Sequence, residues 1–241
     1  RNREYQSKIS IMQTTVERWP QPRAYQLLAH AHLEAGHHDE ALKYLRLAKE
    51  DPTSIFMLGI ELISGGQATA GAEELERFIA SAPSHAMTVD AREALGRVYA
   101  ARQPDKAIAH LREVVRREPR RGSAHRTLGA ALVAQGQAAE GIRELQAALN
   151  LQPGDLDNLR QLGIALGETG QLEAAARTFR RAIELYPNSS RDHYLLGRAL
   201  AAMGQIAAAV PYFARAVVLD PQNAEARADL ERAERDTHAA G

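Results

Sequence analysis

The sequence predicts an all-α protein made of stacked helical hairpins, because small residues and helix-ending residues recur with a period of 34 residues. Each period carries two glycines, one alanine and one proline at fixed positions. A fixed period of this length is typical of helical repeat arrays, in which each hairpin packs on the next. The recurring residues are Gly129, Gly163 and Gly197; Gly136, Gly170 and Gly204; Ala148, Ala182 and Ala216; and Pro153, Pro187 and Pro221.

The chain is predicted to begin with a lone helix and to end with a capping helix. Residues 1–20 hold the first helix, the second half of a truncated repeat, and residues 22–223 hold about six hairpins. Residues 224–238 include AEARADLERAERD, whose charged outer face suits a cap, since the last repeat would otherwise expose apolar surface to water. Residues 1–241 are therefore expected to form a single solenoid domain.

The hairpin over residues 156–188 shows the logic of one unit most clearly. Its first helix carries leucines at helical spacing, Gly170 marks the turn, and Pro187 ends the second helix. Gly163 is expected to cross Ala175, with Phe179 filling the space beside them. The equivalent pairs are Gly129 with Gly141 and Gly197 with Ala209. A methyl group added at these crossings should cost about 1–3 kcal/mol through overpacking.

This pattern resembles the tetratricopeptide repeat (TPR). The residues that carry the resemblance in the last unit are Leu196, Gly197, Ala209, Phe213, Ala216 and Pro221. The resemblance implies a right-handed α-solenoid, a TPR superhelix of stacked antiparallel helix pairs. It also implies that the first helices line a concave groove where bound peptides usually lie, and hence a non-enzymatic scaffold for protein–protein interaction.

Register positions taken from the family give two sets of candidate groove residues. Arginine forks and a tyrosine favour carboxylates or other planar anions, whereas the apolar set would seat a hydrophobic helix or extended peptide. Two alternatives stay open: the arginines pair with Glu93, Asp157 and Glu168, or the apolar strip packs against the N-terminal helix or a further domain. The candidates are Arg97, Arg126, Arg160, Gln161, Arg191, Tyr194 and Arg198, together with Phe56, Met57 and Ile60.

One family ligand is disfavoured by the sequence. Chaperone-binding members grip a peptide carboxylate with a set of lysine, asparagine and arginine side chains. Arg126 and Arg191 match two of the cations, but Ala130, Gln161 and Leu195 replace the other members. We therefore do not expect an Hsp70 or Hsp90 cochaperone.

Composition and charge exclude several classes of function. The 30 basic and 30 acidic residues give zero formal charge, which argues against a nucleic-acid or membrane-surface binder. A run of arginines from Arg112 to Arg126 is interpreted as a solvated outer face, with an anionic partner as the alternative. Cysteine is absent, and no run of 18 apolar residues occurs. The chain begins with Arg1 rather than methionine, so we expect it to be part of a longer protein.

No arrangement of side chains predicts catalysis or a cofactor. His30, His32, His37 and His38 are the densest group of candidate metal ligands, but a site needs at least three converging donors, so we interpret them as ordinary surface histidines. Ser189 with Asp192 is interpreted as a helix cap, and His193 as a packing residue.

The leading hypothesis is a scaffold that binds a peptide or protein segment in its groove. The alternative is an extracytoplasmic accessory domain of a membrane-anchored protein, because the stretch IMQTTVERWPQPRA is similar to the tails of bacterial glycosyltransferase-like membrane proteins. Self-association through the solenoid ends is a third possibility. The compartment, cytoplasmic or periplasmic, is left open.

Overall fold

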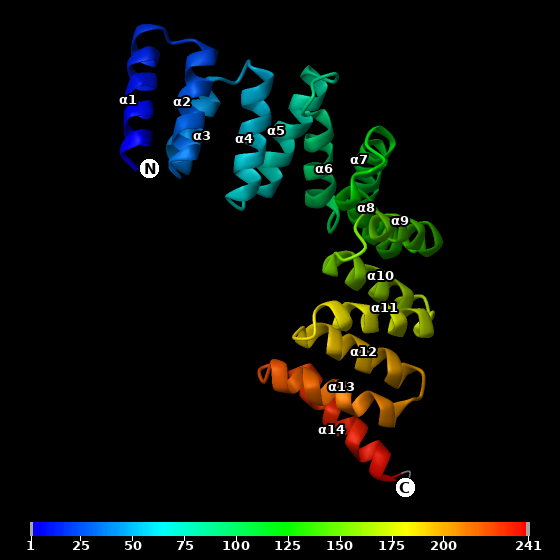
Figure 1. The fold of residues 1–241 in the computed structure, drawn as a ribbon. Helices are drawn as coiled ribbons and strands as arrows, with labels where there is room; N and C mark the ends of the chain where they lie inside the picture. Colours follow the sequence, from blue (N-terminus) through cyan, green and yellow to red (C-terminus); the bar gives the residue numbers. More distant parts are fainter. Residues whose placement is uncertain (1, 240–241) are drawn as a thin grey trace. The chain divides into compact units, whose positions relative to one another are not determined.

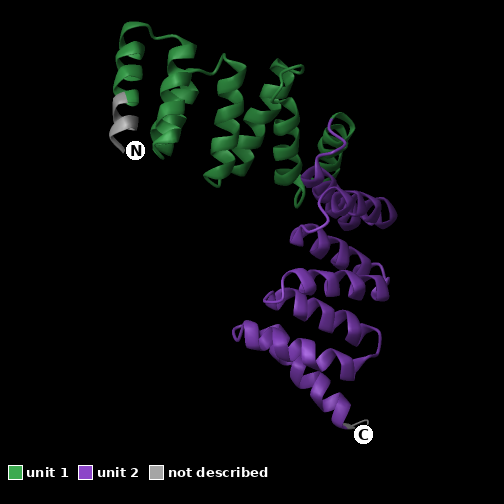
Figure 2. Ribbon diagram, viewed as in Figure 1, with its two compact units in different colours: residues 1–117 green, residues 118–241 purple. Residues whose placement is uncertain are grey.

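The structure is a computed structural model that describes the backbone of residues 2–239 and the side chains of residues 8–238. It comprises two compact units, residues 1–117 and residues 118–241 (Figure 2). Whether the whole chain acts as one continuous solenoid domain stays a prediction.

The described residues form α-helices joined by short turns, with no strand among them, so the predicted all-α class is confirmed (Figure 1). In unit 1 the helices are α1 (Asn2–Arg18), α2 (Pro22–Glu34), α3 (His38–Leu47), α4 (Pro52–Ser64), α5 (Ala68–Ser81), α6 (Thr88–Tyr99) and α7 (Pro104–Arg117). In unit 2 they are α8 (Gly122–Ala134), α9 (Ala138–Leu151), α10 (Leu156–Glu168), α11 (Leu172–Leu185), α12 (Ser190–Ala202), α13 (Ile206–Leu219) and α14 (Ala224–Ala239). The six hairpins α2–α3 to α12–α13 match the predicted repeats.

Local chemistry explains where these helices begin and end. Asp155 and Ser189 are N-caps, whose side chains accept a hydrogen bond from the backbone N–H three residues later. The cap predicted at Ser189 and Asp192 is thereby confirmed. Gly170 ends the turn between α10 and α11 with φ of +77°, a conformation that residues with a Cβ rarely adopt.

Glycines of the first helices pack closely against the second helix of the same hairpin. A Cβ added at Gly129 would lie 2.7 Å from the carbonyl oxygen of Gly141, which confirms that pair. A Cβ added at Gly163 or Gly197 would meet the ring of Phe179 at 2.5 Å or of Phe213 at 2.7 Å, so the ring fills the space beside the glycine as predicted. The aromatic residue of the second helix therefore takes the space that glycine leaves open.

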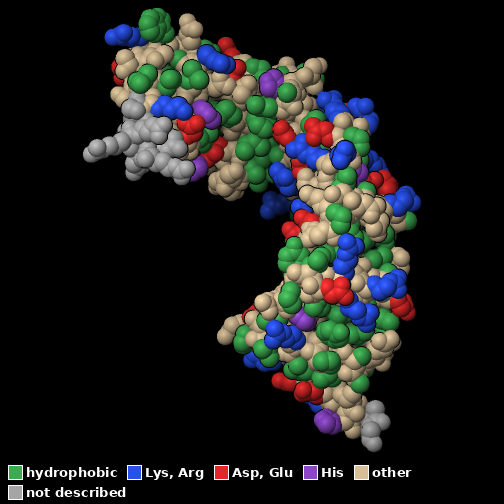
Figure 3. All heavy atoms as spheres, in the orientation of Figure 1, with side chains coloured by type: hydrophobic (Ala, Val, Ile, Leu, Met, Phe, Trp, Pro, Cys, Tyr) green, Lys and Arg blue, Asp and Glu red, His purple; other side chains and the backbone are tan. Residues whose placement is uncertain are grey.

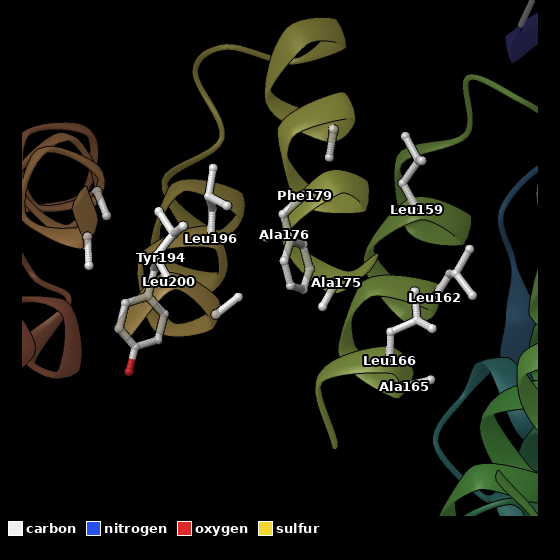
Figure 4. Packing of buried hydrophobic residues seen from close by; sticks show 14 of the residues in the cluster. Leu159, Leu162, Ala165, Leu166, Ala175, Ala176, Phe179, Tyr194, Leu196 and Leu200 are labelled. Carbon is white, nitrogen blue, oxygen red and sulfur yellow. The ribbon is translucent and has the colours of Figure 1, made fainter. Parts of the chain in front are cut away.

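A continuous apolar core runs through unit 2 from α9 to α14. Figure 4 shows the Phe179 ring of α11 between the leucines of α10 and the side chains of α12. The core extends into α14, where Ala226 and Ala233 are buried, whereas Glu225, Arg232 and their exposed neighbours face solvent. The C-terminal helix thus covers the last hairpin as predicted.

Candidate interaction surface

In unit 2 the first helices of the three hairpins are α8, α10 and α12. The fifth residue of α8 and of α10 bonds to the next of these helices or its N-cap, and the fifth residue of α12 bonds to the capping helix α14. These residues are Arg126 on α8, Arg160 on α10 and Tyr194 on α12, all three predicted as groove residues. Arg126 Nη1 donates to Asp155 Oδ1 at 3.2 Å, beside the N-terminus of α10. The Tyr194 hydroxyl donates to Asp229 on α14 at 3.1 Å. The fifth position therefore links successive hairpins.

The contact of Arg160 is the most fully buried of the three. Its Nε and Nη2 donate to the two carboxylate oxygens of Asp192 at 2.9 and 3.0 Å, and its Nη1 donates to Asp157 at 3.2 Å. The Asp192 side chain is 0% exposed, and the Ser189 hydroxyl gives it a further hydrogen bond at 2.5 Å. The hydrogen bond to Asp192 raises the pKa of Arg160. Because every arm of this guanidinium has a protein partner, we assign Arg160 to the scaffold rather than to a ligand.

Tyr194 is also occupied by the protein itself. Its side chain is buried, and Arg198 lies over its ring with the guanidinium carbon 5.7 Å from the centroid. Burial raises the pKa of Tyr194 to about 12, and the Asp229 carboxylate acts in the same direction. Most of the Tyr194 side chain is thus buried against α14, and only a small part of it lines a hollow near the start of that helix.

Three shallow hollows lie between successive first helices of unit 2. Their volumes are about 200 Å³ between α8 and α10, 190 Å³ between α10 and α12, and 240 Å³ between α12 and α14. Ile164 lines the first two hollows, and Arg198 lines the last two. Most other lining side chains are apolar or small: Ala130, Val133, Ala134, Ala165, Leu195, Ala199, Ala201 and Ala202.

The ninth position of each first helix therefore faces these hollows: it holds Ala130, Ile164 and Arg198. Gln161, at the sixth position of α10, lines the first hollow, and Leu195, at the same position of α12, lines the second. The register taken from the family includes these positions, but charged residues were favoured within it, so Ile164 and Leu195 are absent from the sequence-based candidates. Their half-burial beside alanines is the feature that distinguishes them.

Arg191 lies at a separate, more polar hollow of about 540 Å³ near the start of α14. It is exposed, and Ser190, Asn223 and Glu225 share the lining with it. The arginine set predicted from the sequence is therefore divided. Arg126 and Arg160 are paired with aspartates of the protein, whereas Arg191 and Arg198 remain at the surface.

The apolar strip of unit 1 is half-buried in its own hairpins. Phe56 and Ile60 pack on the cluster that contains Phe78, with the Phe56 and Phe78 ring centroids 5.5 Å apart. Met57 packs on a different cluster, around Leu45. The strip therefore has an exposed part and a buried part. The neighbouring groove candidate Arg97 has a 60% exposed side chain, 3.4 Å from the buried Glu93 carboxylate.

Part of the arginine run is paired with acidic side chains of its own segment. Arg116 and Arg117 both donate to Glu113, at 2.7–2.8 Å and 2.6 Å respectively. These hydrogen bonds lower the pKa of Glu113 to about 2. In the face that Figure 3 shows, basic and acidic side chains are interspersed with hydrophobic ones. The structure therefore agrees with a solvated, internally paired surface at α7.

The four clustered histidines do not converge as a group. His30 lies 3.4 Å from Glu34, and His38 lies 2.5 Å from Glu61. His32 and His37 do meet, with their Nδ1 atoms 3.4 Å apart. Within the described residues, no three side chains of the metal-binding types come together around a possible ion. Across the same residues, none of the helices has both the length and the apolar character needed to span a bilayer.

These features define a helical repeat domain for protein interaction. Three family models, each described as a tetratricopeptide repeat, match residues 22–50, 98–165 and 160–224. The chain belongs to the tetratricopeptide repeat family, as its recurring residues predicted. No curated protein matches the chain in sequence.

Solved structures of other TPR-type proteins are similar to this chain. The C-terminal part of a TPR repeat-containing protein from Cytophaga hutchinsonii superposes with a TM-score of 0.74 over 95% of both chains, at 16% identity, which shows the fold alone. MamA from Desulfovibrio magneticus RS-1 is 25% identical over 69% of this chain and 95% of its own, with a TM-score of 0.64. MamA MSR-1 is 28% identical over 69% and 97%, with a TM-score of 0.61. The comparisons do not show the similarity to membrane-protein tails.

Proposed function

We propose that the first-helix surface of unit 2 binds a peptide or protein segment through its three hollows. The observation that carries the proposal is their periodicity: a hollow of similar size recurs between each pair of first helices. A repeated row of small apolar hollows suits a linear ligand that places one side chain in each. Hollows of about 200 Å³ are smaller than the roughly 300–1,000 Å³ typical of small-molecule sites, which favours side chains as occupants.

The spacing of the hollows indicates the spacing of the ligand's anchors. α10 contacts both α8 and α12, and at the usual distance between packed helices neighbouring first helices would lie about 8–10 Å apart. An extended chain advances about 3.3 Å per residue, so three residues span that distance. The ligand is therefore an extended segment with an apolar residue at about every third position.

Charge at the edges of the middle hollow adds specificity. Glu168 and Arg198 both line it, and they offer partners for a basic and an acidic ligand side chain respectively. Arg191 extends the basic side toward the start of α14. Gln161 supplies a neutral hydrogen-bonding group at the first hollow.

Unit 1 offers a second, separate surface of the same kind. The half-buried Phe56, Met57 and Ile60 would provide apolar contact, and Arg97 would provide a cation. Methionine adapts to ligands of varied shape, which suits this position. The groove candidates of unit 1 are therefore retained in the proposal, whereas Arg126, Arg160 and Tyr194 are not.

The test is to select peptides from a random displayed library on the immobilised full chain and then measure their affinity for variants. Leu195→Glu and Arg198→Glu should weaken the selected peptides at least about tenfold, since each change removes a contact in the middle hollow. Arg180→Glu on α11 is the matched control, because that exposed arginine lies on a second helix. Equal binding to Leu195→Glu and wild type, or loss caused by Arg180→Glu, would refute the proposal.

Two further expectations stay predictions. Self-association through the solenoid ends would give a molar mass that rises with concentration in light scattering. Binding of nucleic acid is not expected, and a filter-binding assay at low salt would test this, since electrostatic binding is strongest there.

A further inference from the structure

His32 and His37 are brought together by the turn that joins α2 to α3. Gly36 adopts φ of +78°, and the backbone N–H of His37 donates to the carbonyl oxygen of His32 at 2.8 Å. This turn places the two ring Nδ1 atoms 3.4 Å apart. The pair therefore results from a fixed backbone conformation rather than from the chance meeting of two mobile side chains.

The two rings differ in exposure. His32 is buried, and its ring stacks on Tyr44 with centroids 5.5 Å apart and an interplanar angle of 12°. His37, the N-cap residue of α3, is exposed. The ring of His32 is thus held in place, whereas the ring of His37 is open to solvent and to an incoming ion.

The separation of the two nitrogens matches two adjacent ligands of one metal ion. Imidazole nitrogens bind Zn²⁺ at about 2.0–2.1 Å, and two such bonds at the tetrahedral angle put the nitrogens about 3.3–3.4 Å apart. A direct hydrogen bond between ring nitrogens is typically nearer 2.9–3.0 Å, so 3.4 Å is long for one.

Ligation requires a neutral imidazole. Burial lowers the pKa of His32, which favours its neutral form; Glu40 opposes this shift, and His37 and Lys43 add to it. A neutral ring that carries its proton on Nε2 presents the Nδ1 lone pair to an ion.

The geometry points to an open transition-metal site in which His32 and His37 supply two cis ligands to Zn²⁺, Ni²⁺ or Cu²⁺. Water, or a donor from a partner, completes the coordination sphere, in keeping with the lack of a third ligand among the described side chains. The site lies in unit 1 and is independent of the surface proposed in unit 2.

The test titrates the full chain with Ni²⁺ alone, and separately with the Cu²⁺ complex of iminodiacetate, at pH 7.5 by calorimetry. We expect one equivalent to bind and to raise the thermal midpoint. His37→Ala, at an exposed position, should weaken binding at least about tenfold and abolish that rise. His32→Gln should do the same. His30→Ala, an exposed histidine outside the pair, should leave both unchanged.

Two outcomes would overturn the proposal. One is the absence of saturable binding up to millimolar metal. The other is binding that His37→Ala leaves intact, which would assign the affinity to scattered surface histidines. Circular dichroism of His37→Ala, expected to match the wild type, separates loss of the ligand from loss of the fold.

Discussion

Replacement of Arg160 by alanine should destabilise unit 2 far more than the same change at Arg126, although both residues hold the fifth position of a first helix. Asp192 is 0% exposed, and Arg160 supplies two of its hydrogen bonds. Removing one partner of a buried ion pair typically costs about 3–5 kcal/mol. The Ser189 hydroxyl still solvates the carboxylate, so we expect the lower end, about 3 kcal/mol.

The Arg126 pair lies nearer to solvent. Its partners Asp155 and Asp157 have side chains that are 32% and 65% exposed, so either carboxylate is hydrated when the arginine is removed. Partly exposed pairs of this kind contribute about 0–1 kcal/mol. Arg160→Ala should therefore lower the free energy of unfolding by about 2–3 kcal/mol more than Arg126→Ala, and this difference follows from burial alone.

Hydrogen exchange measured by mass spectrometry suits this comparison, because repeat arrays unfold in segments rather than in one step. A loss of about 3 kcal/mol corresponds to exchange in α10–α12 that is faster by about a hundredfold. The double variant Arg160→Met with Asp192→Leu should recover most of that loss, since neither charge then remains buried. Equal effects of Arg160→Ala and Arg126→Ala, or no recovery in the double variant, would refute the reasoning.

Three other predictions follow from the geometry. Gly129→Ala should destabilise by about 1–3 kcal/mol in urea unfolding, because its Cβ would lie 2.7 Å from a backbone carbonyl that cannot move aside. Gly167→Ala should instead stabilise by about 0.5–1 kcal/mol, since its Cβ would have only an ordinary 3.9 Å contact; a loss there would contradict the packing described. Burial lowers the pKa of His110 below 6.5. The unfolded chain therefore takes up the proton first as the pH falls through 6.5. The contribution of His110 to stability is thus complete above pH 7 and decreases below 6.5. The free energy of unfolding of unit 1 should therefore be lower at pH 5.5 than at pH 7.5, and His110→Gln should make this difference smaller. If the difference is the same in that variant, the pH dependence comes from other groups.

The fold was predictable from sequence because one hairpin is specified by local signals that repeat. Glycine at each turn, proline after each second helix and leucines at helical spacing each follow from backbone chemistry within a single unit. The crossing at Gly163 was less predictable, since glycine and alanine in register suggest a contact between backbones. Whether Phe179 or Ala175 lies nearest depends on the rotamer that packing selects.

The candidate surface was harder to predict because its residues act between hairpins. Arg160 on α10 and Arg198 on α12 carry the same charge, but only Arg160 has a buried carboxylate opposite it, that of Asp192 on α12. The 32 residues between Arg160 and Asp192 were the one sequence signal for this ion pair. A separation close to the repeat length places two residues on adjacent hairpins. The approach of His32 to His37 depends on a left-handed glycine in the turn, which periodicity does not reveal.

The contacts of Arg126, Arg160 and Tyr194 between successive hairpins also determine how the repeat array could change in length. Removal of residues 155–188, one full period, would bring Arg126 to the distance in sequence from Asp192 that Arg160 now has. Ser189 would still cap α12 in the shortened array, and Tyr194 would still reach Asp229. A whole hairpin could thus be lost, or by the same reasoning duplicated, without leaving a buried charge unpaired. The Arg–Asp contact therefore allows these repeats to be exchanged in evolution and in engineering.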